Sequence, residues 1–410
     1  MKIWLKYIIA VAIGLIFAFV SGFDNAVFNN AVQAISEISI QIGRYALYPV
    51  VFFGLTIGIF NLRDTKRLGK LFLFFICFTV GAALLLSLIG MLSLWIARPS
   101  RIPIFIEKST EIPVPGIKNF FLRLFPSSAF SALVDGSFIM PLCIFGGFAG
   151  MGFSAVEKQF SKPGLNIFDS FSRVAYAVMA FFVDFFALCV VAVSAYWMFR
   201  FRTMLASNFF TDFIFLLLID MIIIVAGVYP LIIKIFCKDV NPYKILYASL
   251  APMLIAFFTG DANATLPVTI RHVHESLGVR RRISNVATPL LSVFAKAGTA
   301  MVLTISFMVI FMSYSSQQMG ISGMLWLVFI STFFSFFLGM FPQRGAYIAI
   351  AGICMLYGSG FEAGYLILKP AVFFIEAVAL VINTVTTITG TYIAGYISDL
   401  IIDKDARFFI

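Results

Sequence analysis

Long apolar runs separated by short polar or basic stretches dominate this sequence. Several runs exceed the roughly 20 residues that a helix needs to cross the hydrocarbon core of a bilayer. Because the backbone must satisfy its own hydrogen bonds in lipid, such runs predict helices. The predicted transmembrane helices cover residues of about 3–21, 42–61, 71–97, 127–153, 168–199, 209–237, 286–312 and 366–397.

Two further apolar segments are each interrupted by a polar break. From Tyr243 to Leu277 the break is GDANAT (260–265), and from Ile321 to Tyr357 it is GMFPQRG (339–345). Paired interruptions point to the binding site of a secondary transporter, because half-helix ends present free N–H and C=O groups to ions and substrates. The alternative is that both breaks are kinks or ordinary loops; their matched arrangement favours the first interpretation.

Composition agrees with the membrane class. The 410 residues are 61% hydrophobic and 12% charged, whereas a soluble domain is roughly a quarter charged. The net charge of +10 lies largely in short loops such as NLRDTKRLGK (61–70) and GVRRR (278–282), which the positive-inside rule explains without nucleic acid. We expect a multi-pass protein of the plasma membrane (in a bacterium, the inner membrane) with both termini cytoplasmic. Arg200 and Arg202 fall outside and count against this orientation.

The sequence contains no pattern typical of an enzyme or of a cofactor site. The five cysteines lie in apolar runs without metal-ligand spacing, so they are interpreted as small buried hydrophobic residues. No nucleophile and base converge in one motif. The expectation is a protein without catalytic activity, cofactor or confidently placed metal.

Three stretches carry a resemblance to a known family. TGDANATLPVTIR (259–271) contains Thr265–Thr269, which match a T-L-P-[IV]-T motif at a re-entrant hairpin tip. FPSSAFSALVDGSFIMPLCIFGGFAGMG (125–152) is similar to a fourth-helix pattern, and ITGTYIAG (388–395) to the end of a last helix. Over nearly its whole length the chain resembles the dicarboxylate/amino acid–cation symporters, the glutamate transporter homologues.

The resemblance implies a fold and an assembly. The expected fold is an all-α polytopic membrane protein, with eight transmembrane helices and two re-entrant helical hairpins in inverted repeats. It also implies a homotrimer in the lipid bilayer, whose transport units move like elevators against a scaffold. The implied division is 1–240 mainly scaffold (with the third and sixth helices beside the transport unit), 241–285 hairpin 1, 286–318 seventh helix, 319–360 hairpin 2, and 361–410 eighth helix and cytoplasmic tail.

The sequence departs from the family at its sodium-binding residues. The family motif N-M-D-G-T aligns with Ala295–Thr299, and a sodium-liganding aspartate of the last helix aligns with Thr387. In the third helix the family's sodium ligands align with Thr79, Ala82 and Ala83. Hard cations need several oxygen ligands, and only Asn383 remains as a clear remnant. We therefore expect the sodium sites to be largely absent, with H⁺ a better candidate than Na⁺ as coupling ion.

The resemblance also implies a set of substrate-binding positions. Glu376 aligns with an aspartate that takes a substrate amino group, and Ala379 with an arginine that takes a carboxylate. An arginine from hairpin 2, Arg344, can serve that carboxylate instead. The expected substrate-binding residues are Asp261, Ala262, Asn263, Thr299, Pro342, Arg344, Gly345, Glu376 and Asn383.

Each charged residue of that set has a second interpretation. Arg344 can anchor to lipid headgroups, Glu376 can be the counter-ion of Lys296 or Arg344, and Asp261 can simply cap a half-helix. His272 and His274 are expected at the surface.

Lys296 lies within the apolar run LSVFAKAGTAMVL (291–303). A charge at a helix centre costs about 2.5–3.5 kcal/mol on insertion scales, so Lys296 is expected to face the interior near Glu376 or Asp261. The hypothesis is that its ammonium occupies the space of a sodium ion and that its proton exchange couples transport to protons. The alternative is a purely structural ion pair.

These observations predict a secondary active transporter of a small organic anion or amino acid, such as a dicarboxylate, glutamate or aspartate. Two alternatives remain open. One is that the chain is a non-transporting, sensor-like relative, and the other is that it is an anion-conducting channel on the same fold.

Overall fold

The computed structural model describes residues 2–20, 26–97, 99–103, 116–134, 138–205, 209–315 and 319–410. Throughout this part of the chain the regular elements are helices, and the one β-bridge, between Val279 and Ile401, is isolated. Seven helices or helix pairs are long and apolar enough to cross a membrane, and eight if one bent pair, Pro242–Ala248 with Leu250–Thr259, counts as a span. The predicted all-α membrane fold is therefore confirmed.

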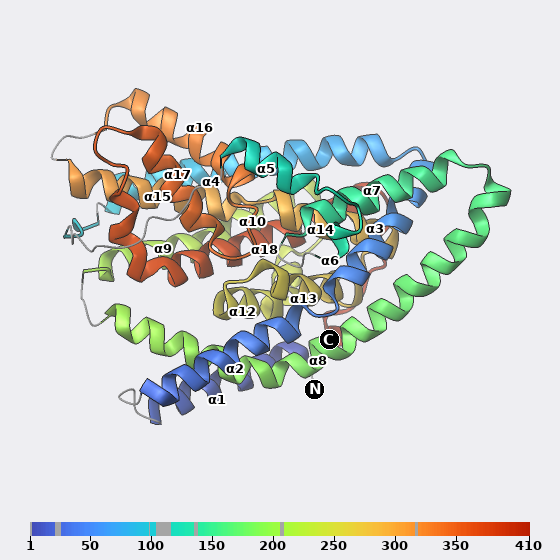
Figure 1. Cartoon of the computed structure of the whole chain (residues 1–410), viewed down its shortest axis with the longest axis horizontal. Helices are drawn as coiled ribbons and strands as arrows, with labels where there is room; N and C mark the ends of the chain where they lie inside the picture. Colours follow the sequence, from blue (N-terminus) through green and yellow to red (C-terminus); the bar gives the residue numbers. More distant parts are fainter. Residues whose placement is uncertain are drawn as a thin grey trace.

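The first half of the chain supplies the outer helices (Figure 1). They are α1 (Ile3–Val20), α2 (Ala26–Arg44), α3 (Leu47–Asp64), α4 (Leu68–Ala97), α5 (Ile117–Leu124), α6 (Ser131–Val134), α7 (Met140–Ala155), α8 (Lys158–Leu205), α9 (Thr211–Ile223), the π-helix η1 (Ile224–Val228) and α10 (Tyr229–Phe236). The 48-residue α8 runs along one edge of the molecule beside α1 and α2.

Three predicted spans of this half are wrong in their bounds. The fifth, 168–199, is too short, because α8 extends beyond it at both ends. The second, 42–61, is part of a 36-residue span from Asn29 to Asp64. Its first part is amphipathic rather than uniformly apolar, with polar pairs such as Gln33 and Glu37 one turn apart. The fourth, 127–153, is not one long helix, because α7 has only 16 residues. Pro141 lies in its first turn, where proline is well tolerated because its missing N–H would have no partner there.

The second half supplies broken helices. They are α11 (Pro242–Ala248), α12 (Leu250–Thr259), α13 (Ala262–Glu275), α14 (Arg281–Phe294), α15 (Ala297–Tyr314), α16 (Ile321–Phe337), α17 (Gly345–Tyr357), the 3₁₀-helix η2 (Gly364–Ala371), α18 (Val372–Ile397) and the 3₁₀-helix η3 (Ala406–Phe408). The breaks between α12 and α13 and between α16 and α17 fall within the two polar stretches of the sequence. This arrangement is compatible with two re-entrant hairpins.

The prediction of one continuous helix over 286–312 is wrong at Lys296. The helix stops at Phe294 and restarts at Ala297, with an inverse γ-turn between them: Lys296 N donates to the Phe294 carbonyl at 2.8 Å, and Ala295 has φ −79° and ψ 69°. Lys296 therefore lies between two half-helices and not at a helix centre.

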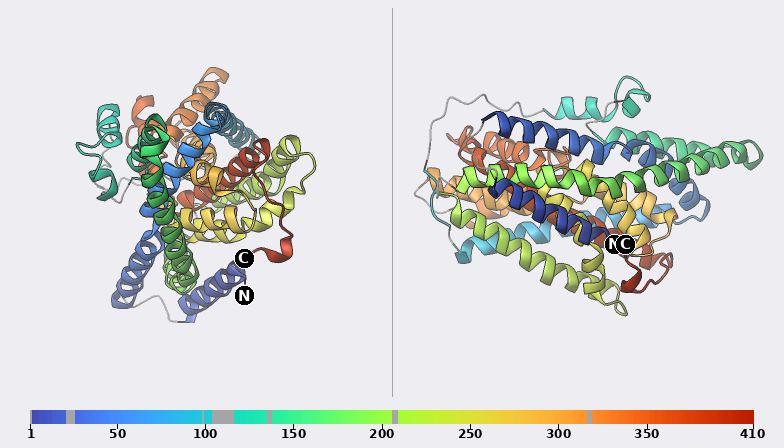
Figure 2. Two further views of the ribbon diagram at one scale, coloured as in Figure 1. Left: turned by 90° about the vertical axis from the view of Figure 1, so that its right-hand side faces the viewer. Right: turned by 90° about the horizontal axis from the view of Figure 1, so that it is seen from below.

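The broken helices form the interior of the bundle. The span of α14 and α15 is 94% buried and that of η2 and α18 is 78% buried, against 33–39% for the spans of α1, α4, α8 and α9–α10. The outer helices therefore leave apolar faces for lipid or for other subunits. The two termini lie side by side on one flank of the molecule (Figure 2), where Lys2 bonds to Tyr247 and to the Ala406 carbonyl.

A glycine sets how closely α15 approaches α18. A Cβ added at Gly298 would lie 2.5 Å from the Ala379 carbonyl oxygen and 2.6 Å from the Ile382 Cβ, whereas one at Gly81, on the exposed face of α4, would meet nothing within 4 Å. The two helices can therefore pack this closely only because position 298 has no side chain.

Gly298→Ala should lower the stability of the protein by about 1–3 kcal/mol, because the new methyl group forces α15 away from α18. Gly81→Ala is the matched control, since it makes the same change in a helix without a clash and should be neutral or stabilising. Melting of both purified variants in detergent measures the difference. Equal melting temperatures for the two variants would contradict the close approach.

Candidate functional site

The two helix breaks meet inside the bundle. Ala262 N, at the start of α13, donates to the Pro342 carbonyl at 3.1 Å. The side chain of Gln343 donates to Asp261 Oδ2 at 2.6 Å. The first and second predicted hairpin tips are thus joined directly, as a binding site between them requires.

Asp261 accepts hydrogen bonds from two of the first backbone amides of α13. Its Oδ1 accepts from Asn263 N at 2.7 Å and Ala264 N at 3.2 Å. Its carboxylate is fully buried, and Arg44 at the end of α2 lies 3.7 Å away. The capping interpretation is therefore realised in the structure, and the same carboxylate also connects hairpin 2 and α2.

Glu376 of α18 does the same for α17. Its Oε1 accepts from Tyr347 N at 2.9 Å, and Ala346 N also donates to this carboxylate. Arg344 precedes α17 in a left-handed conformation with φ 56°. Its side chain is exposed. Gly345 packs against the other side of the break, where a Cβ would lie 3.0 Å from the Gly339 carbonyl oxygen.

Asn383, two turns further along α18, holds the start of α15. Its Oδ1 accepts from Thr299 N at 3.2 Å, and its Nδ2 donates to Thr299 Oγ1 at 2.8 Å. The restart of α15 inside the apolar interior is possible because this amide replaces a missing turn of helix. Three half-helix N-termini are thus capped by Asp261, Glu376 and Asn383.

Lys296 faces a small polar cavity. The cavity, of about 10 Å³, is large enough for one water at most. Among the described residues Lys296 forms no ion pair with Asp261 or Glu376, although the Glu376 charge acts on it from a longer distance. The cavity is lined by Ala262, Thr265, Leu266, Thr269, Ser292, Lys296, Leu380, Asn383, Thr384 and Thr387.

The hydroxyls of this cavity are arranged as acceptors. Those of Thr265, Thr269, Thr384 and Thr387 each donate to the carbonyl four residues earlier, at 2.7–3.0 Å. A hydroxyl has one proton and two lone pairs. Its lone pairs therefore remain available as acceptors, and Lys296, which is buried, lines the same cavity.

A larger cavity of about 510 Å³ reaches the hairpin tips from outside. Arg44 and Arg123 line it together with Pro342 and Gln343. Arg344 does not line this cavity. Neither arginine nor Gln343 is among the predicted site residues, because the two arginines belong to elements distant in sequence from the tips. The only available signal was that Arg44 interrupts an apolar segment.

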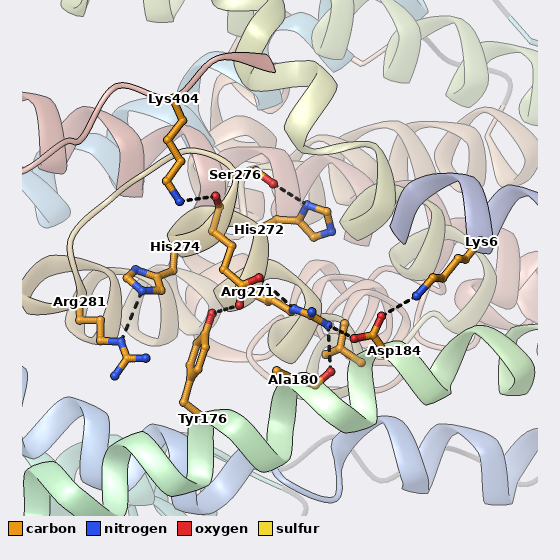
Figure 3. Close-up of polar contacts among 12 residues, drawn as sticks. Lys6, Tyr176, Ala180, Asp184, Arg271, His272, His274, Ser276, Arg281 and Lys404 are labelled. Carbon is orange, nitrogen blue, oxygen red and sulfur yellow. Dashed lines mark hydrogen bonds and ion pairs between the residues drawn. The ribbon is translucent and has the colours of Figure 1, made fainter. Parts of the chain in front are cut away.

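A second polar cluster joins α13 to α1 and α8 (Figure 3). Arg271 donates to Asp184 Oδ2 at 2.9 Å and to the Ala180 carbonyl at 2.8 Å, while Lys6 donates to Asp184 Oδ1 at 2.8 Å. His272 is 2% exposed, so its expected surface position is wrong. The reason is that it lies on the face of α13 that packs into the bundle.

Paired broken helices that meet at buried polar groups are typical of secondary transporters, and this chain has that architecture. The family model described as "Sodium:dicarboxylate symporter family" matches residues 3–399. The chain belongs to that family, which consists of transporters and not of enzymes.

The curated relatives are distant. The chain is 24% identical to the proton/sodium-glutamate symport protein of Bacillus subtilis (strain 168), over 79% of this chain and 75% of that protein. It is 21% identical to the proton/sodium-glutamate symport protein of Geobacillus stearothermophilus, over 70% of this chain and 68% of that protein. A shorter match, 33% identical, covers 22% of this chain and 16% of the human neutral amino acid transporter B(0).

Removing the Asp261 carboxylate should destabilise the protein. Asp261→Ala leaves the amides of Asn263 and Ala264 and the Gln343 side chain without their acceptor, at a cost of about 1–3 kcal/mol for each buried donor that finds no water. Asp261→Asn keeps a capping oxygen and should retain more of the stability. Thermal melting in detergent measures the order, with Glu157→Ala, an exposed carboxylate, as control. The same loss for the Asn and Ala variants would show that capping is not its main contribution.

Proposed function

We propose that the chain is a secondary active symporter of a small carboxylate-bearing anion, such as a dicarboxylate, glutamate or aspartate. Support comes from the guanidinium groups of Arg44 and Arg123 in the cavity that leads to the hairpin tips. Arginine suits carboxylates because its fork can bind both oxygens. Both bacterial relatives are proton/sodium-glutamate symport proteins, which agrees with this class.

The proposed substrate contacts are the tip residues and the α18 residues already described. Asn263 adds support, because its buried Nδ2 has no hydrogen-bond partner among the described residues. Thr299, Pro342, Gly345 and the backbone at Ala262 surround the same junction. Arg344 is proposed as a mobile contact at the mouth of the site, since its side chain is exposed.

We further propose that the coupling ion is H⁺ and that Lys296 replaces a bound cation. The single observation that carries this proposal is that Lys296 is buried, forms no ion pair within the described part of the chain, and lines a cavity whose threonine hydroxyls have lone pairs to offer. An ammonium group tethered to the chain can neutralise that cavity when protonated. When it loses its proton, the neutral amine keeps two N–H donors but no charge, which changes the stability of that state.

The assembly and orientation remain proposals that rest on the family. They are a homotrimer, an elevator movement of the broken helices against a scaffold, a location in the bacterial inner membrane, and cytoplasmic termini. The basic loops near the paired termini agree with that orientation by the positive-inside rule.

Uptake into proteoliposomes tests the coupling. Radiolabelled aspartate, glutamate and succinate should accumulate under an inward proton gradient in sodium-free buffer, and replacing choline by sodium should change the rate less than about twofold, because no full sodium site is expected. An uptake that depends steeply on sodium would refute the proposal.

Lys296→Met, which keeps the volume but removes the charge, separates a coupling role from a structural one. Gradient-driven accumulation should fall by about tenfold or more, because the variant cannot exchange a proton at this position. Substrate exchange between loaded vesicles, which needs no gradient, should persist. Lys70→Met, at an exposed position in the first turn of α4, is the control. If exchange is lost together with accumulation while the variant melts like the wild type, Lys296 does not act in coupling.

A ligand screen separates the transporter from the sensor-like and channel alternatives. Dicarboxylates and acidic amino acids should raise the melting temperature of the wild type, and Arg123→Ala should weaken the effect by about tenfold, as expected for one charge-assisted hydrogen bond. A sensor would bind such a ligand without vesicle uptake, and a channel would pass anion current in bilayers without any of these ligands.

A further inference from the structure

A large cavity shares no lining residue with the cavity at the hairpin tips. It has a volume of about 750 Å³ and lies between α3, α8 and the start of α14. It is at the end of α3 next to the basic loop 61–70, which the positive-inside rule assigns to the cytoplasm. None of the proposed substrate-binding residues lines this cavity, and neither does Lys296.

This cavity is strongly basic. Six cationic side chains line it and only one carboxylate, that of Asp169. Asp169 pairs with Arg173 at 2.9 Å, and Asp64 outside the lining pairs with Lys158 at 3.2 Å. The cationic residues are Lys158, Lys162, Arg173, Arg280, Arg281 and Arg282.

Most of this charge is not neutralised by the chain. Subtracting the two carboxylates from the six cations leaves a charge of +4. Lys162, Arg280 and Arg282 form no ion pair within the described ranges. Arg281 lies over the Tyr176 ring at 4.7 Å, which orients it but adds no negative charge. An anion of more than one charge would fit this surplus.

The position of three arginines at the start of α14 makes the excess positive charge of this cavity more unfavourable. Arg280 is its N-cap, and Arg281 and Arg282 are its first two residues. The N-terminus of a helix carries the positive end of the macrodipole, so cations there are unfavourable and anions are favourable. Three consecutive arginines at this end are therefore better explained by an anion between them than by helix stability.

The lining is also partly apolar, which favours a lipid over a soluble anion. Ile57, Phe60 and Leu165 contribute to it. The same part of α8 exposes Ile167 and Phe171, which are 56% and 53% exposed. A phospholipid would place its phosphate among the cations and its acyl chains along these side chains.

We propose that this cavity binds the phosphate headgroup of an anionic phospholipid. The headgroup contacts cationic side chains of both α8 and α14. It therefore offsets the repulsion between the positive charges that these two helices carry here. It acts beside the tight contact of α3 with α14, where a Cβ at Gly58 would lie 2.4 Å from a methyl of Val286.

Lipid titration of the purified protein in detergent tests the proposal, with native mass spectrometry and melting temperature as readouts. Phosphatidylglycerol should remain bound and raise the melting temperature, whereas phosphatidylcholine should do neither. The double variant Arg280→Gln with Arg282→Gln should lose about tenfold or more in phosphatidylglycerol affinity. Lys162→Gln, at an exposed position on α8, is the second variant, to be used if the double variant does not fold.

The matched control removes two charges from the same end of the protein but outside the cavity, as Lys66→Gln with Lys70→Gln. It should bind phosphatidylglycerol like the wild type. An equal loss in the control would show attraction by the general surface potential and would overturn the site. Inorganic phosphate or glycerol 3-phosphate that displaces the lipid completely at low millimolar concentration would overturn the lipid assignment in favour of a soluble anion. Equal binding of phosphatidylcholine would refute both.

Discussion

The structure depends on one constraint: a helix that begins inside an apolar interior must find acceptors for its first amides within the protein. Three helices of this chain begin there. Asp261 supplies the acceptor for α13, Glu376 for α17 and Asn383 for α15. Two of these three side chains belong to α18, which is why this helix lies at the centre of the bundle and is buried over most of its length. The polar groups of the site therefore have a structural function, the capping of helices, whether or not they also bind substrate.

The same constraint explains how a lysine is tolerated in this region. A break in a helix exposes backbone dipoles, and the threonines around Lys296 turn their protons toward carbonyls of their own helices. What remains facing the cavity is acceptor lone pairs, a surrounding that suits a cation. In the proposed coupling a lysine supplies the cation at a fixed position, whereas an ion would have to enter and leave. On that proposal the departures from the family pattern at Ala295–Thr299 and Thr387 form one coordinated change and not several independent losses.

Much of this was accessible from the sequence, and the failures have definite causes. The breaks after Thr259 and before Gly345 were predicted because polar and proline residues interrupt apolar runs there. The break at Lys296 was missed because its partner, Asn383, lies in a distant helix. The helix α2 was missed because its polar face, with Gln33 and Glu37, resembles a loop. The cavity arginines Arg44 and Arg123 could not be found at all, since only the tertiary fold brings them to the tips.

Polar contacts within the group of broken helices differ from the polar contacts that this group makes with the outer helices. The caps and the bond between Ala262 and Pro342 are short, buried and directional, and they tie α13, α15, α17 and α18 into one unit. Its contacts with the outer helices are of two kinds. Buried hydroxyl pairs, Ser87 with Thr304 and Tyr229 with Thr386, tie it to α4 and α10, whereas the ion pair of Arg271 with Asp184 ties it to α8 through a partly exposed carboxylate. Breaking a buried hydrogen bond leaves donors without partners, whereas water can replace a partly exposed ion pair at little cost. Any large movement within this protein should therefore break the contact with α8 and leave the caps and the contacts with α4 and α10 intact.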